Sequence, residues 1–316
     1  MRIAGCEGLL APQGAWEEIM DFFELLKAAL FGLVEGITEW LPVSSTGHML
    51  LLDEFVKLNV SPDFWDMFLV VIQLGAILSV LVLFFDRLNP FSGHKSANES
   101  KGTWRLWAQV IVACLPAAVI GIPLDDWMEE HLGSPIVVAA ALIVYGIAFI
   151  VIENARNNAP SGAHAARPSG GLLSLTSDSE ARVQDVFDMD WRTAIGIGLF
   201  QVLSMVPGTS RSGSTIIGGL LLGCSRAVAA EFTFFLAIPV MVRASGLRLV
   251  KFFLKGNMFT GQELAILGVG CVVAFAVSML AIRFLMNFVK EHDFKPFGWY
   301  RIALGLVVLA YFLFRG

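Results

Sequence analysis

The hydrophobic positions of this chain form long, continuous apolar runs rather than short alternating ones. About 20 helical residues cross a hydrocarbon core of about 30 Å, and continuous runs argue against a β-barrel, whose strands alternate. We therefore predict six transmembrane helices. They are expected at residues 64–86, 104–124, 134–152, 228–250, 263–289 and 297–315.

Composition supports a membrane location. Of the 316 residues, 56% are hydrophobic and 16% are charged, whereas a water-soluble domain of this size is less apolar. The expected fold class is an all-α integral membrane protein, with the bilayer as a partner and no nucleic acid. The four cysteines have no spacing typical of a disulfide framework or a metal site.

A hydrophilic segment at residues 153–191 divides the chain into two halves of similar organisation. Each half begins with two short apolar helices around a tip of Pro, Ser and Thr, at 25–60 and at 192–226, and three spans follow. Short, Pro- and Gly-interrupted helices are typical of re-entrant hairpins whose tips meet near the bilayer midplane. The predicted organisation is a lead-in at 1–24, a first repeat at 25–152, a cytoplasmic loop at 153–191 and a second repeat at 192–316.

The three spans in each half give the two repeats opposite orientations in the membrane. Lys and Arg side chains gather in the connections 86–105, 153–192 and 290–296, which this topology places on one side, while the turn at 125–133 has none. The positive-inside rule makes the first side cytoplasmic. The first hairpin then starts at the outer face, where we expect the active site to open. Lys251 and Lys255 are a mild counter-signal.

The tip of the first hairpin, "EGITEWLPVSSTGH", is polar for such an apolar chain. Glu35 and Glu39 are four residues apart, so they share a helix face, with Cβ atoms about 6 Å apart. Two carboxylates this close at membrane depth need a shared proton or a cation. They predict an acid–base pair or a metal site, and solvated glutamates at headgroup level are the alternative.

Hydroxyl side chains of Ser44, Ser45 and Thr46 stand where the second helix of this hairpin begins. Capping of the helix is their simplest interpretation, but the free N–H groups and positive dipole of a helix N-terminus also form an anion site. His48 lies one turn after Ser45. Beside serines and carboxylates, we expect it to be catalytic rather than a packing residue.

The tip of the second hairpin, "VPGTSRSGST", repeats this pattern with Ser210, Ser212 and Thr215 and adds Arg211. An arginine at membrane depth is costly without a functional partner, and its guanidinium can grip a phosphate with two hydrogen bonds. Together the two tips predict a phosphate site with its own acid and base.

The segments "EGITEWLPVSSTGH", "PGTSRSGSTIIGGLLLG", "EFTFFLAIP" and "GWYRIALG" closely resemble the undecaprenyl-diphosphate phosphatases, the bacitracin-resistance family. The resemblance covers almost all of residues 25–315. It implies a bacterial enzyme of the cytoplasmic (inner) membrane that converts a polyprenyl diphosphate to the monophosphate and inorganic phosphate, recycling the lipid carrier of cell-wall synthesis. Arg243 and Arg248 depart from the family pattern, and we expect them to pair with lipid headgroups or with Glu231.

In the phosphatase hypothesis, Arg211 and Ser210 hold the phosphoryl oxygens and Ser45 is the favoured nucleophile. His48 or a glutamate serves as base, and a His48 nucleophile is the open alternative. Glu35 and Glu39 bind Mg²⁺ or Ca²⁺, or activate the attacking group. The sequence leaves the metal, the prenyl chain length and the oligomeric state open.

Two other functions compete with this hypothesis. Inverted repeats with broken helices are a recurring transporter design, so the same scaffold could flip a lipid phosphate, but transport does not require two glutamates, a serine and a histidine at hydrogen-bonding spacings. Acid-phosphatase-like lipid phosphatases are the second alternative. The chain lacks the basic motif before Pro, and the His followed four residues later by Asp, that would indicate them.

Overall fold

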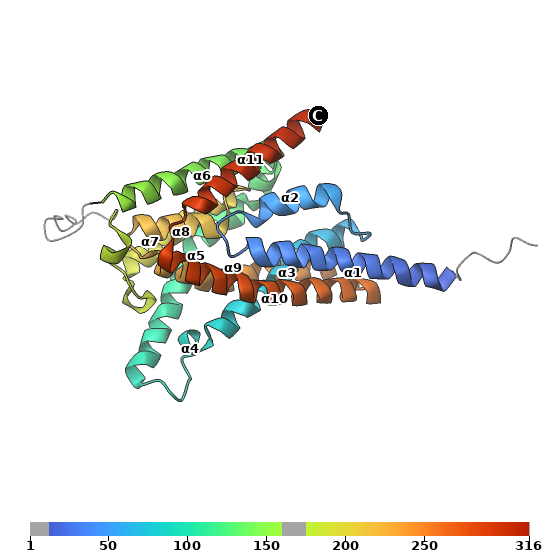
Figure 1. The fold of residues 1–316 in the computed structure, drawn as a ribbon. Helices are drawn as coiled ribbons and strands as arrows, with labels where there is room; N and C mark the ends of the chain where they lie inside the picture. The colour runs from blue at the N-terminus through green and yellow to red at the C-terminus, as the bar shows by residue number, and fades with distance from the viewer. Residues whose placement is uncertain (1–12, 160–174, 316) are drawn as a thin grey trace, which may run out of the picture.

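The computed structural model describes residues 13–159 and 175–315, and these residues fold into a bundle of α-helices (Figure 1). Within them the β-type pairing is one isolated parallel bridge between Val183 and Cys224. The α-helices are α1 (Gln13–Thr38), α2 (Ser45–Phe55), α3 (Pro62–Leu83), α4 (Phe85–Leu88), α5 (Ala97–Leu132), α6 (Pro135–Asn157), α7 (Trp191–Val202), α8 (Arg211–Leu221), α9 (Arg226–Leu254), α10 (Gly261–Glu291) and α11 (Lys295–Arg315). Three 3₁₀ turns are η1 (Asp178–Glu180), η2 (Val186–Asp188) and η3 (Leu203–Met205).

The prediction of six spans is confirmed. Six described helices are long and apolar enough to cross a membrane, namely α3, α5, α6, α9, α10 and α11. The predicted turn at 125–133 is wrong, because α5 continues to Leu132. Acidic residues do not break a helix, and the helix ends only where Gly133 and then the Ser134 cap of α6 follow.

The first helix of the first hairpin is longer than expected. We predicted a short helix beginning near residue 25, but α1 has 26 residues and begins at Gln13, inside the segment assigned to the lead-in. Its acid-rich start contains no proline, so nothing in the sequence stops the helix from extending there. The corresponding helix α7 has 12 residues. The two hairpins are therefore unequal in length.

Helix packing shows the relationship between the two repeats. α1 of the first repeat packs along α10 of the second, and α7 of the second repeat packs along α5 of the first (Figure 1). In addition, α6 lies beside α11, and α3 lies beside α9. Glycines allow both exchanged contacts: a Cβ on Gly32 would come within 2.5 Å of Gly270 O, and one on Gly198 within 2.2 Å of Ala113 O. Each repeat thus holds the first helix of the other.

The three Lys- and Arg-rich connections lie together at one end of the bundle, as the charge pattern predicted. Side-chain contacts show this. At one end, Arg87 pairs with Asp185 at 2.8 Å, and Glu153 accepts a hydrogen bond from Phe294 N at 3.0 Å. These contacts join the three Lys- and Arg-rich connections. At the opposite end, Asp63 pairs with Lys255, which offsets the positive charge that had been a counter-signal.

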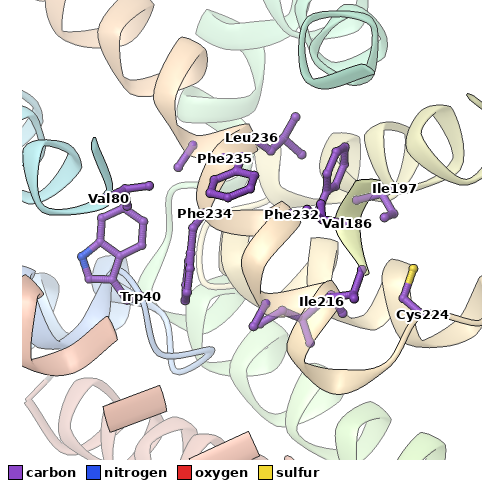
Figure 2. Close-up of a cluster of buried hydrophobic side chains, with 14 of the residues drawn as sticks. Trp40, Val80, Val186, Ile197, Ile216, Cys224, Phe232, Phe234, Phe235 and Leu236 are labelled. Atoms are coloured by element: carbon purple, nitrogen blue, oxygen red, sulfur yellow. The ribbon is translucent and has the colours of Figure 1, made fainter. Parts of the chain in front are cut away.

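A buried aromatic cluster around α9 supports the hairpin tips. Trp40, just before the first tip, is fully buried and contacts Phe234 edge to face with ring centroids 5.3 Å apart (Figure 2). Phe232 and Phe235 of the same helix are also fully buried. Burial of large aromatic side chains is a major stabilising contribution, and here it fixes the first tip against the helix that carries Thr233.

Candidate active site

The two hairpin tips have the same local backbone geometry. Ser44 caps α2 with a φ of 73°, and its hydroxyl accepts a hydrogen bond from Gly47 N at 3.4 Å; Ser210 caps α8 with a φ of 72° and accepts one from Gly213 N at 3.1 Å. Left-handed backbone is unfavourable for serine and is found where surrounding structure imposes it, often at functional sites. The caps therefore define which residues of the two tips correspond.

This correspondence differs from the one that the prolines suggest. Pro42 precedes its cap by two residues and Pro207 precedes its cap by three, so the second tip is one residue longer. Matching the caps places Ser45 opposite Arg211 in the repeat. One tip thus presents a hydroxyl where the other presents a guanidinium.

Arg211 joins the two tips. Its Nη2 donates to Glu39 Oε1 at 2.9 Å, and its Nη1 donates to Thr233 O of α9 at 2.9 Å. Ser212 Oγ also donates across the junction, to Leu41 O at 3.3 Å. The Arg211 side chain is 12% exposed, and its Nε has no hydrogen-bond partner among the described atoms. The guanidinium retains donors for an anion while it is held in place.

The other oxygen of the Glu39 carboxylate holds Ser45. Ser45 Oγ donates to Glu39 Oε2 at 2.8 Å, so one carboxylate is shared between a cation and a hydroxyl. Glu39 is 7% exposed and Ser45 is half-buried. A hydroxyl bonded to a carboxylate that a third group orients has the geometry of a nucleophile with its base.

His48 has different partners from those expected. Its Nδ1 lies 2.7 Å from Ser44 O and its Nε2 lies 2.7 Å from the Tyr300 hydroxyl. A carbonyl only accepts, so Nδ1 carries the proton, and in the neutral ring Nε2 accepts from Tyr300. The structure therefore pairs Ser45 with Glu39 rather than with His48. Tyr300 also stacks on the His48 ring at 5.6 Å.

Glu35 lies one helical turn before Glu39 and is 1% exposed. Its Oε1 has no hydrogen-bond partner within the described part of the chain. A buried, unpartnered carboxylate oxygen requires a proton or a cation. Among the described residues there is no group of three or more His, Cys, Asp or Glu side chains suited to a metal, so the protein offers two carboxylates. An oxygen-only set of this kind fits Mg²⁺ or Ca²⁺ when substrate oxygens and water complete it.

A second buried arginine, Arg301 of α11, donates hydrogen bonds to backbone carbonyls of both tips. Its Nη1 donates to Pro42 O at 3.2 Å, and its Nη2 donates to Gly208 O at 3.0 Å and to Thr209 O at 2.8 Å. The side chain is fully buried. Arg301 and Tyr300 lie in "GWYRIALG", but no role was predicted for them because their partners are more than 90 residues away in the chain.

The remaining predicted phosphate ligands divide into two groups. Thr46 is exposed at the start of α2, and Ser210 lies half-buried with its hydroxyl 3.1 Å from that of Ser212. Thr215 is fully buried: its hydroxyl donates to Arg211 O at 2.8 Å and lies 2.9 Å from the Thr233 hydroxyl. Thr215 therefore supports the backbone of Arg211 instead of facing a ligand.

Glu231, the expected partner of Arg243 and Arg248, pairs with a different arginine. Glu231 is 4% exposed and pairs with Arg87 Nε at 2.9 Å. Arg87 comes from α4, in the Lys- and Arg-rich connection between α3 and α5. The expectation that Arg243 or Arg248 pairs with Glu231 is therefore wrong, because a closer cation already neutralises this carboxylate.

Comparison with known proteins agrees with the geometry of the two tips. Residues 28–307 match the family described as bacitracin resistance protein BacA, which includes both hairpins and nearly all of the spans. The chain belongs to the BacA family. The undecaprenyl-diphosphatase of Streptococcus thermophilus (strain ATCC BAA-250 / LMG 18311) is 54% identical over 288 residues, covering 91% of this chain and 93% of that protein.

Two further relatives have the same name. The undecaprenyl-diphosphatase of Enterococcus faecalis (strain ATCC 700802 / V583) is 50% identical over 295 residues, which is 93% of this chain and 100% of that protein. The undecaprenyl-diphosphatase of Limosilactobacillus fermentum (strain NBRC 3956 / LMG 18251) is 53% identical over 289 residues, covering 92% and 98%. The resemblance inferred from the motifs is thereby confirmed over most of the chain.

Proposed function

We propose that this BacA-family chain is an undecaprenyl-diphosphatase, which hydrolyses undecaprenyl diphosphate to undecaprenyl phosphate and inorganic phosphate. The observation that carries the proposal is the shared carboxylate of Glu39, which holds Ser45 with one oxygen and Arg211 with the other. It combines a nucleophile, a base and an anion-binding cation, and it agrees with the names of relatives at 50–54% identity.

In the first step the terminal phosphoryl group binds to the free donors of Arg211 and to the N-terminus of α2. Ser45 Oγ attacks phosphorus while its proton passes to Glu39 Oε2. The bond from phosphorus to the bridging oxygen breaks, and undecaprenyl phosphate leaves with the electron pair. Positioning and charge neutralisation supply most of the acceleration in such transfers.

In the second step water attacks the phosphoserine and completes the hydrolysis. Glu39 donates its proton to the Ser45 oxygen as the phosphorus–oxygen bond breaks, and the proton of the attacking water leaves with the inorganic phosphate. The enzyme returns to its starting state. His48, held by Ser44 O and Tyr300, keeps the strained cap of α2 in place, and a phosphohistidine route is the alternative that trapping distinguishes.

A divalent cation, Mg²⁺ or Ca²⁺, is part of the proposal. Glu35 would hold it together with Glu39, and its role would be to neutralise charge on the phosphate oxygens. The proton transfers above involve Ser45, Glu39, water and phosphate, and none of them depends on the cation.

The proposed location is the bacterial inner membrane, with the site open to the outer face. Support comes from the clustering of the Lys- and Arg-rich connections at one end of the bundle, which the positive-inside rule makes cytoplasmic. α1 begins at the opposite end, where Lys27 donates to Lys57 O and Gln262 donates to Asp21.

Purified protein and a polyprenyl diphosphate test the function directly. We expect release of one phosphate per lipid by the wild type and none above background by Ser45→Ala. The rival function, a lipid-phosphate flippase, predicts no phosphate release by the purified protein but movement of labelled lipid phosphate between leaflets of proteoliposomes. Transport without phosphate release would overturn the proposal.

A further inference from the structure

A cavity of about 360 Å³ lies beside Arg211, between α5, α7, η3, the start of α8 and α9. We call it the Arg243 cavity, and it is lined by Arg211, Arg243, Gln201 and mainly small or apolar residues. Two arginines line it, and none of its lining residues is a carboxylate. The positive charge of its wall therefore suits an anion. Because Arg211 forms part of that wall, the cavity adjoins the proposed catalytic site.

Gln201 supplies an independent indication of a ligand. It is 2% exposed, and neither its amide nitrogen nor its amide oxygen has a hydrogen-bond partner among the described atoms. Buried polar groups of proteins are almost always hydrogen-bonded, and leaving one unpaired costs about 1–3 kcal/mol. An oxygen-rich ligand in the cavity would accept from its amide N–H and reduce that cost.

Arg243 is the second cation of the cavity. It has no hydrogen-bond or ion-pair partner in the described structure, although it lies within the spanning helix α9. An arginine at such depth is costly unless it meets a ligand or a paired group. It is ten residues beyond Thr233, about 15 Å along the helix axis, and helical side chains tilt toward the N-terminus. The Arg243 side chain is exposed at this surface, and it lines the same cavity as Arg211, which Thr233 O holds.

The wall on α5 is built from small side chains. Cys114, Ala117, Ala118 and Gly121 line the cavity and are spaced i, i+3, i+4 and i+7, so they form one face of the helix. Small residues here leave an apolar surface with space beside it. A ligand that fits this cavity has an anionic end at Arg243 and Gln201 and an apolar continuation along α5.

We propose that the Arg243 cavity binds the lipid-linked phosphate, the one that stays on the prenyl chain, together with the first prenyl units. Arg211 lies between this phosphate and the terminal phosphoryl group at Ser45. This inference rests on the proposed function, since it divides a diphosphate between two subsites. It assigns Arg243 and Gln201 to recognition of the lipid and leaves the bond-breaking step to the tips.

The test measures binding of two probes to purified protein, so that it does not depend on turnover. Undecaprenyl phosphate carries only the lipid-linked phosphate, and orthovanadate mimics only the terminal one. We expect Arg243→Gln to weaken undecaprenyl phosphate binding at least tenfold and to change orthovanadate binding less than twofold. Arg248→Gln is the matched control: Arg248 lies on the same helix but lines a separate depression with Asp63 and Asp66, so both affinities should stay unchanged.

Gln201→Leu gives a second readout that a structural role would not produce. Removing an unpaired buried amide should raise the melting temperature of the ligand-free protein, while binding of undecaprenyl phosphate weakens. Lower stability with unchanged binding would assign Gln201 to packing and overturn its place in the site.

The outcomes separate this inference from the proposed function. Equal losses for both probes, or no loss for either, in Arg243→Gln would overturn the separate subsite, and so would failure of the wild type to bind undecaprenyl phosphate. Wild-type protein that binds undecaprenyl phosphate through Arg243 but releases no phosphate from the diphosphate would leave the inference standing and reject the phosphatase.

Discussion

Ser45 and Arg211 are the first residues of α2 and α8, and each follows a serine held at positive φ. The two positions are equivalent in the repeat, but one carries a hydroxyl and the other a guanidinium. Glu39 bonds to both, at 2.8 Å and 2.9 Å. A symmetric scaffold therefore presents a single asymmetric site, with the proposed nucleophile from one half and the proposed phosphate-binding cation from the other.

Arg211→Lys should reduce phosphate release to less than about a tenth of the wild-type rate although the charge is kept. A lysine cannot bind Glu39, Thr233 O and a phosphate at once, because it lacks the planar fork. The measurement is phosphate release from a polyprenyl diphosphate at saturating substrate. Arg248→Lys is the control, and a variant Arg211→Lys that keeps most of its activity would exclude the forked contact.

Replacing the two glutamates should have different effects. Glu39→Gln removes the proposed base and the ion pair with Arg211, so the rate should fall on the order of 10²-fold or more. Glu35→Gln leaves the Ser45 and Arg211 contacts intact, and we expect it to raise the half-saturating concentration of Mg²⁺ or Ca²⁺ by about tenfold. Cation titrations of both variants check this. If neither titration changes, the pair is not the metal site.

The covalent intermediate should be a phosphoserine. A phosphoserine survives acid and is lost in alkali, whereas a phosphohistidine behaves in the opposite way. Rapid quenching of the enzyme with a labelled terminal phosphate should give an acid-stable adduct that is absent in Ser45→Ala and present in His48→Ala. An alkali-stable adduct that depends on His48 would identify the histidine as nucleophile. No adduct under either quench would indicate direct attack by water.

Arg301→Leu should destabilise the protein by about 3 kcal/mol, because three buried carbonyls lose their donor. It should also lower the rate per folded molecule, since Pro42 and Thr209 lie in the two tips. Arg301→Lys should restore part of both. Thermal unfolding and the rate per folded molecule are the readouts; normal kcat and KM in folded Arg301→Leu protein would limit Arg301 to a structural role.

The sidedness of the bundle can be tested with cysteines in a background lacking the native ones. Asn59 is exposed at the end where α1 begins, and Ser179 is exposed in the Arg-rich connection at the other end. We expect an impermeant thiol reagent to label Asn59→Cys but not Ser179→Cys in intact cells. The reverse pattern would place the site on the cytoplasmic side.

The spans and the two tips could be predicted because their signals are local. Continuous apolar runs identify helices of membrane length, and Pro, Ser and Thr identify the tips. The sequence predicted that the two tips meet, but it did not predict the specific contact between Glu39 and Arg211. It follows from both tips contacting α9, through Trp40 on Phe234 and Arg211 on Thr233 O, which no local pattern encodes.

Other features depend on long-range contacts and were missed. Arg301 and Tyr300 have polar side chains in a helix that otherwise resembles a lipid-facing span, and their roles follow from partners far away in the chain. The length of α1 and the end of α5 were misjudged for a different reason. Acidic residues suggest a loop by polarity, yet they are compatible with a helix when no proline or glycine interrupts it.

The exchange of first helices between the repeats has a consequence for biosynthesis. α1 is made first, but α10, its packing partner, is complete only at Glu291, and Arg301, which fastens both tips, follows in α11. The amino-terminal hairpin, with Glu39 and Ser45, therefore enters the membrane long before its support exists. The enzyme cannot mature one half at a time, and a chain truncated before residue 301 should have all the residues of the two tips but no assembled site.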